Sequence, residues 1–169
     1  MKATLIIEGK EIEIEISEEE YKKLQPPKEK KTGYERVPDP NGYFYVNAKG
    51  EVEYGVDLYD YIDDKYYNSA NYYSSRDVAE NNARADKLAR QLRRFAVEHR
   101  EPGFNFNDIN AKKYYICYDC ENGELNVSFV FRTKKFGAIY FDLGETANAA
   151  IDEFRDELIW YFTEYKEGL

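Results

Sequence analysis

Near the N-terminus, apolar and charged residues alternate at a period of two. An apolar run at 5–7 and a turn at 8–10 precede residues 11–16, in which glutamate and isoleucine take turns. Strict alternation is typical of a strand with one buried face. The two runs and the turn between them therefore predict a β-hairpin with an apolar face and a glutamate face.

A short helix and a linker are expected after the hairpin. Ser17 and Glu20 have the spacing of a capping box, in which each side chain satisfies a backbone N–H at the start of a helix, so we predict a helix over 18–24. The next stretch, 26–33, opens with two prolines and continues with charged residues, as linkers do. Residues 1–25 are therefore predicted to form an appendage to the rest of the chain.

The remaining residues, 34–169, carry two successive sets of strand and helix patterns. In the first half, 34–100, we predict strands at 43–47, 51–56 and 71–73 and a helix over 76–98. In the second half, 101–169, we predict strands near 113–119, 124–132 and 137–141 and a helix over 145–166. Each predicted helix has apolar residues every three to four positions, which marks a buried stripe.

The two halves share a local pattern that recurs after 68 positions. Tyr72-Tyr73 and Tyr140-Phe141 each end a predicted strand just before a predicted helix. We interpret this as an internal duplication, and because one helix cannot cover both faces of its own small sheet, the two units should pack together. The predicted fold class is α+β: an N-terminal β-hairpin with a short helix, then two tandem ββ(β)α repeats whose antiparallel sheets pack with two long helices.

The charge balance narrows the expected partners. The chain of 169 residues holds 24 Lys and Arg against 33 Asp and Glu, a formal net charge of −9. This disfavours direct binding to nucleic acid or to an anionic membrane, and it favours a protein partner with a basic surface or simple solubility. No run approaches the roughly 18 apolar residues of a membrane span, and the N-terminus lacks a signal-peptide pattern, so we expect a cytoplasmic protein.

Patterns that carry catalysis are largely missing from the sequence. His99 is the single histidine, and no phosphate-binding loop or nucleophile motif occurs. Cys117 and Cys120 lie in a predicted strand, where positions three apart point to opposite faces, so we expect no disulfide between them. The sequence thus predicts no catalytic residue, no cofactor and no metal. An enzyme that works through paired carboxylates stays a third alternative.

Acidic and aromatic residues are concentrated between positions 57 and 73. Tyrosine offers a large rigid contact surface with a polar tip, and it is enriched at binding hot spots. We therefore predict a partner-binding surface that includes Asp57, Asp60, Asp63, Asp64, Tyr59, Tyr61, Tyr66 and Tyr67. Ordinary packing of tyrosines in strands is the competing interpretation. The carboxylates at 60, 63 and 64 are an alternative site for a divalent cation, although their spacing does not match an EF-hand.

The predicted C-terminal helix carries a second acidic face. Glu153, Asp156, Glu157 and Glu164 fall away from its apolar stripe, with Trp160 among them. A tryptophan off the buried stripe is either covered by the appendage or exposed as an anchor for a partner, and we predict a partner-binding role for it and these acids. The helix over 76–98 has the opposite charge on its polar face, at Arg84, Lys87, Arg90 and Arg94.

Four segments carry a resemblance to a known group of proteins. They are KTGYERV at 31–37, NSANYY at 68–73, LRRFA at 92–96 and AIYF at 138–141. In these the chain resembles small proteins encoded by phages and prophages of Gram-positive bacteria, except that it has Ala70 and Tyr73 where the pattern has glycine and phenylalanine. The resemblance implies a phage accessory role. Acidic proteins of this size in phages are often inhibitors of host defence, anti-CRISPR proteins among them.

We therefore predict a phage-encoded inhibitor that binds a basic surface of a CRISPR effector nuclease in the cytoplasm of the host cell. Effector nucleases hold nucleic acid in positively charged channels, so the acidic and aromatic faces either mimic a duplex or block the channel sterically. The alternative is a protein that binds or sequesters a small ligand, a nucleotide second messenger or a sugar, in a tyrosine-lined cup. The duplication is equally compatible with a homodimer.

Overall fold

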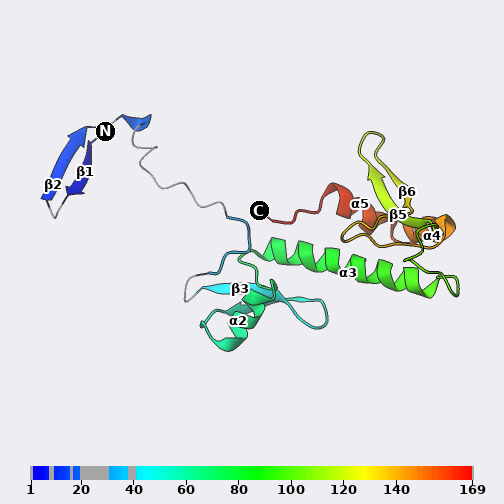
Figure 1. Ribbon diagram of the computed structural model, residues 1–169. Helices are drawn as coiled ribbons and strands as arrows, with labels where there is room; N and C mark the ends of the chain where they lie inside the picture. The colour runs from blue at the N-terminus through cyan, green and yellow to red at the C-terminus, as the bar shows by residue number, and fades with distance from the viewer. Residues whose placement is uncertain (1, 8–9, 16, 20–30, 38–40, 169) are drawn as a thin grey trace. The chain divides into compact units, whose positions relative to one another are not determined.

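The computed structural model describes residues 2–7, 10–15, 17–19, 31–37 and 41–168 (Figure 1). The chain divides into two compact units, Met1–Lys31 and Thr32–Leu169, so the boundary falls within the stretch predicted as a linker. The first unit contains the predicted hairpin, in which β1 (Lys2–Ile7) pairs antiparallel with β2 (Lys10–Glu15). Of the helix predicted over 18–24, positions 18 and 19 are helical and the others lie outside the described residues.

The first half of the second unit contains a hairpin and two helices. The strands β3 (Gly42–Val46) and β4 (Val52–Val56) pair antiparallel, as predicted. Helix α2 (Tyr61–Asn68) was not predicted, because its eight residues, YIDDKYYN, contain no apolar stripe at helical spacing. Helix α3 (Arg76–Glu98) has the predicted bounds and, at about 1.5 Å per residue, is about 35 Å long.

The second half repeats the hairpin but not the single long helix. The strands β5 (Lys113–Asp119) and β6 (Glu124–Val130) pair antiparallel, again as predicted. The helix predicted over 145–166 is instead two helices, α4 (Gly144–Glu153) and α5 (Arg155–Thr163). The helical path breaks at Phe154, which has φ −111° and ψ 21° and whose ring packs edge-on against Phe95.

The third strand predicted in each half is reduced to a single bridge. In the first half Tyr73 pairs with Phe44, and in the second half Phe141 pairs with Tyr114. Each pair exchanges two backbone hydrogen bonds of 2.8–2.9 Å. Both halves therefore join their hairpin in the same way to the helix that follows, as a duplicated unit requires, although descent from a duplication stays a prediction.

Helix α3 connects the two halves because it packs on both hairpins (Figure 1). Its first turns place Val78 and Ala79 against Tyr73 and the β3–β4 hairpin. Its later turns place Leu88, Leu92 and Phe95 in a larger core with α4, α5 and the β5–β6 hairpin. The described part of the second unit thus has four helices and two small antiparallel sheets, and the fold class is α+β, as predicted. None of the described helices is both long and apolar enough to cross a membrane.

Four charged side chains of the described residues are buried: Asp57, Asp63, Lys113 and Asp142. Lys113 donates to the carbonyl oxygens of Asp108, Ala111 and Phe131, which closes the 108–113 loop on the end of β6. Asp142 accepts from the backbone N–H of Glu101 at 2.6 Å. Buried charges are costly unless they are paired or hydrogen-bonded, and these two are. The other two lie in the acidic and aromatic segment singled out by the sequence.

Candidate functional site

The start of α2 is built by two aspartates. The carboxylate of Asp60 accepts from the backbone N–H groups of Ile62 and Asp63 at 2.7 and 3.1 Å. The carboxylate of Asp63 accepts in return from the N–H groups of Asp60 and Leu58, at 3.3 and 2.8 Å. Such a reciprocal capping box satisfies backbone donors that a helix leaves unpaired at its N-terminus. These two carboxylates therefore act as caps that set where α2 begins.

Asp57 is completely buried and is bound by Arg36. The guanidinium donates through Nε and Nη2 to the two carboxylate oxygens, at 2.8 and 3.0 Å. The Tyr72 hydroxyl and the Tyr59 backbone N–H also donate to this carboxylate, both at 2.9 Å. The Arg36 guanidinium is the main reason that the pKa of Asp57 falls from 3.8 to about 2. Asp57 is thus a charged structural residue and is not exposed to a partner, contrary to the prediction.

Arg36 also contacts the surface that α2 presents. Its Nη1 donates to Asp64 at 2.7 Å, and its guanidinium lies over the rings of Tyr59 and Tyr67, with centroid distances of 4.3 and 5.5 Å. One side chain therefore ties the 32–37 segment to the loop before α2 and to α2 itself. This role of Arg36 could not be predicted from the sequence, because a single arginine in a segment without periodicity gives no sign of its partner.

The tyrosines of the first half pack on one another. The rings of Tyr43 and Tyr72 stack at 4.2 Å, and Tyr66 lies against both Tyr43 and Tyr45, at 6.0 and 4.3 Å. The Tyr43 hydroxyl donates to Asp63 at 2.9 Å, so Asp63 is a second buried member of the predicted surface. Burial raises the pKa of Tyr72 to about 12. These rings fill the space between β3 and α2, which counts against the predicted tyrosine-lined cup at this place.

The outer side of the same region exposes large apolar side chains. We call residues 58–67 the α2 surface. Its exposed apolar and aromatic members are Leu58, Tyr59, Tyr61, Ile62 and Tyr67. Leu58 is 69% exposed and Tyr61 71% exposed, and Asp60 is exposed beside them. Of the eight residues predicted to bind a partner in this segment, five thus border one surface, at 59, 60, 61, 64 and 67. Tyr66 is half-buried, and Asp57 and Asp63 lie beneath the surface.

Trp160 is not an exposed anchor. It is 7% exposed, its ring is covered by the guanidinium of Arg84 at 3.9 Å, and Tyr165 packs beside it. The same guanidinium binds both carboxylate oxygens of Glu157, at 2.8 and 3.1 Å. Of the two situations expected for Trp160, exposure as an anchor is not found: side chains of α3, which the projection of a single helix does not include, cover its ring. Glu153, Asp156 and Glu164 are exposed.

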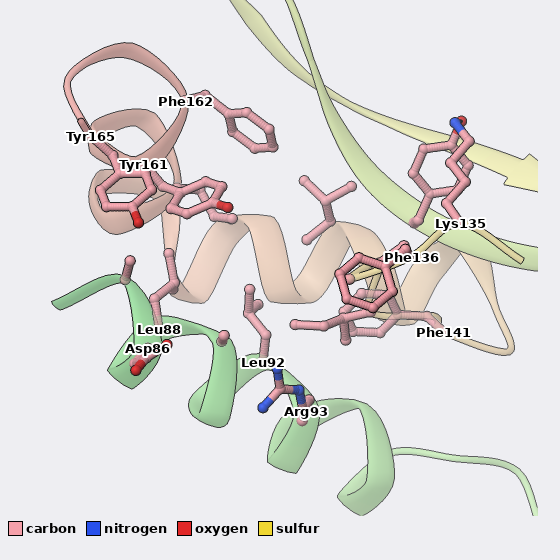
Figure 2. Close-up of a pocket in the computed structure, with 18 residues that line it drawn as sticks. Asp86, Leu88, Leu92, Arg93, Lys135, Phe136, Phe141, Tyr161, Phe162 and Tyr165 are labelled. Carbon is pink, nitrogen blue, oxygen red and sulfur yellow. The ribbon is translucent and has the colours of Figure 1, made fainter. Parts of the chain in front are cut away.

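A groove lies between α3 of the first half and two parts of the second half, α5 and the 135–139 loop (Figure 2). Its volume is about 430 Å³. A second hollow lies between α3 and the α4–α5 junction, where Arg84, Lys87 and Gln91 face residues 152–157. Three cations and four carboxylates line this second hollow, and two ion pairs are formed among them, Arg84 with Glu157 and Arg155 with Asp152.

Residues with catalytic or metal-binding potential are dispersed. Within the described residues no group of three or more His, Cys, Asp and Glu side chains is placed to hold a metal ion. Cys117 and Cys120 are free thiols, the first half-buried and the second exposed. The His99 ring stacks on Phe95 at a centroid distance of 4.0 Å, and its Nδ1 lies 2.9 Å from the Phe95 carbonyl oxygen.

No family model, no curated protein and no solved structure matches the chain. The surfaces described above are therefore the evidence on function.

Proposed function

We propose that the protein is a binding protein that docks on a basic surface of a protein partner through the α2 surface. The observation that carries this proposal is the contrast between a rigid buried frame and the apolar side chains that it exposes. Arg36, Asp57 and Asp63 fix the loop before α2 by charged hydrogen bonds. That loop and α2 carry three side chains that are more than half exposed: Leu58, Tyr61 and the neighbouring Ile62.

A fixed surface of this kind favours binding because little conformational freedom is lost when a partner docks. Tyrosine is also among the residues that most often dominate binding energy. Tyr59 has φ +57°, a left-handed backbone conformation that costs a residue with a side chain roughly 1–2 kcal/mol. Strain of this kind persists where the surroundings enforce it, and it clusters at functional sites. At Tyr59 the hydrogen bond to Asp57 and the contact with Arg36 enforce it.

Charge supports a basic partner. Asp60 and Asp64 border the apolar side chains, and Lys65 lies over the Tyr61 ring at 4.3 Å, where it neutralises part of that charge. The chain as a whole carries −9. Long-range attraction between surfaces of opposite charge raises association rates and disfavours acidic partners.

The partner class we propose is a nuclease of a host defence system, in particular a CRISPR effector, with the protein acting in the cytoplasm of the host cell. The resemblance to phage-encoded proteins and the positive channels of such nucleases support this choice. Steric occupation of the channel by the α2 surface is the favoured mode. Duplex mimicry by the α4–α5 acids is less favoured, because Glu157 is bound to Arg84.

The test is binding of the full chain to purified guide-loaded effector nucleases, with target cleavage measured in parallel. We expect the wild type to bind one effector class and to inhibit its cleavage. The double variant Tyr61→Ala/Ile62→Ala should weaken binding at least tenfold, because truncated hot-spot residues cost about 2 kcal/mol or more. Asp60→Asn should slow association at low salt while it keeps the helix cap, since asparagine caps as well as aspartate.

The matched control is Val97→Ala/Ile109→Ala, which truncates two equally exposed apolar side chains, 61% and 59% exposed, outside the α2 surface. It should leave binding unchanged. Binding that survives the Tyr61/Ile62 change but is lost on Glu153→Gln/Asp156→Asn would assign the interface to the α4–α5 acids instead. Failure of the wild type to bind any effector would reject the partner class.

A further inference from the structure

The groove between α3 and α5 has an apolar floor. Leu88 and Leu92 of α3, Leu158 of α5 and Phe141 line it and are themselves buried. Its volume of about 430 Å³ is within the range of about 300–1,000 Å³ in which proteins bind small molecules.

Aromatic side chains form the walls above this floor. Figure 2 shows Tyr161 and Phe162 of α5 on one side and Phe136 on the other, with Leu88 and Leu92 below them. The Phe136 side chain is fully exposed, although it stands beside an apolar groove that a phenyl ring is suited to cover. Aromatic faces on two sides favour a flat ligand, since stacked or edge-on ring pairs contribute about 0.5–1.5 kcal/mol beyond the area they bury.

The polar groups at the rim include two cations. Arg93 lines the groove, and its side chain makes no hydrogen bond, ion pair or ring contact with any other residue that the structure describes. Lys135 donates to the Tyr115 hydroxyl at 2.6 Å, which occupies one of the three donors of its ammonium group. Asp86 is the acid at the groove, two helical turns before Arg93 on α3.

We propose that this groove binds a small amphipathic anion: a flat apolar or aromatic body with a single carboxylate, sulfonate or phosphate group. The body lies on Leu88, Leu92 and Leu158 between the aromatic walls, and Arg93 binds the anionic group. Lys135, which Figure 2 shows on the far side of Phe136 from Arg93, is not part of that contact. The chain has a net charge of −9 and as a whole repels anions. The unpaired arginine beside the apolar groove is a local exception, because it attracts an anion. The site uses residues remote in sequence from the α2 surface and goes beyond the function proposed above.

The test uses two dyes that share a flat body and differ in charge. 1-Anilinonaphthalene-8-sulfonate carries one sulfonate, and N-phenyl-1-naphthylamine has the same rings without it. We expect saturable binding of the sulfonate dye to the full chain at about one site, with quenching of Trp160, the single tryptophan, which lies on α5 one residue before Tyr161. The neutral dye should bind more weakly.

Two variants locate the site. Arg93→Gln should weaken binding of the sulfonate dye roughly tenfold, the effect of losing one charged hydrogen bond, and should leave the neutral dye unaffected. Ala89→Phe fills the groove and should abolish binding of both dyes, with the fold checked by circular dichroism. Arg94→Gln is the matched control, because Arg94 is exposed on the same helix, outside the groove.

Three results would overturn the proposal. They are no saturable binding of the sulfonate dye, equal affinity for the two dyes, and equal effects of the changes at positions 93 and 94. Binding of the sulfonate dye that persists unchanged in Ala89→Phe would likewise place the dye elsewhere. None of these results bears on the α2 surface, so the two proposals fail independently.

Discussion

The change Asp57→Asn tests whether the buried ion pair with Arg36 holds the α2 surface in place. It keeps the shape of the side chain but removes the charge that the guanidinium binds at 2.8 and 3.0 Å. A carboxyl whose pKa falls from 3.8 to about 2 on folding contributes about 2 kcal/mol to the free energy of unfolding at neutral pH.

A second estimate comes from the cost of leaving Arg36 without its main partner. Breaking a buried pair typically costs about 3–5 kcal/mol. Arg36 is 22% exposed and keeps its contact with Asp64, so we expect the low end or less. The two estimates agree on a loss of about 2–3 kcal/mol for Asp57→Asn.

The assay is urea unfolding of wild type and variant, followed by circular dichroism at pH 7 and at about pH 3. Folding lowers the pKa of Asp57, so its contribution is complete above about pH 4 and is lost as the pH falls through 4 towards 2. The difference between the two proteins should therefore shrink to about half at pH 3. Other carboxylates titrate in both proteins and cancel in the difference.

Asp64→Asn is the control, because Asp64 binds the same guanidinium from a half-exposed position. Pairs of this kind contribute about 0–1 kcal/mol, so we expect a loss of that size. A loss for Asp64→Asn as large as that for Asp57→Asn would contradict the assignment of Asp57 as the main partner of Arg36. An Asp57→Asn difference that is the same at both pH values would contradict the lowered pKa of Asp57.

Three further changes test other parts of the fold. Ala70 has φ +57°, so Ala70→Gly should raise the free energy of unfolding by about 0.5–1 kcal/mol, whereas Ser69→Gly, at φ −85°, should lower it; thermal unfolding that moves both in one direction contradicts this. Gly33 has φ +91° and a Cβ there would lie 2.7 Å from Val78, so Gly33→Ala should lower the free energy of unfolding by about 2 kcal/mol or more. Gly103→Ala, at φ +83° with no neighbour within 4 Å, measures the cost of the backbone conformation alone, and an equal loss of stability at both sites would exclude the clash with Val78. Arg84→Met should cost about 1 kcal/mol and shift the emission of Trp160, while Arg90→Met should leave that emission unchanged; unaltered emission in both would mean that Arg84 does not cover the ring.

Features specified by neighbouring residues were predictable. The bounds of α3 and β5 follow from apolar spacing, and the hairpin turns contain Gly50 and Gly123, which adopt the positive φ that such turns require. Helix α2 was not predicted, because the one sequence feature that indicates it is the capping box of Asp60 and Asp63, and it has no apolar stripe. The acidic and aromatic character of the 57–67 stretch was also readable, but not which of its side chains are exposed.

The α+β class, the hairpins and the long helix could be predicted from the sequence, because hydrogen bonds within a hairpin or helix depend on residues close along the chain. Which charges are buried and which apolar side chains are exposed depends instead on contacts between segments far apart in the sequence. Arg36 meets Asp57 across 21 positions, and Arg84 meets Glu157 across 73. These contacts bury Asp57 and cover Trp160, while the packing of α5 against α3 forms the groove. The physical reason is that burial and pairing are properties of side chains that meet in space, and no local period encodes such encounters.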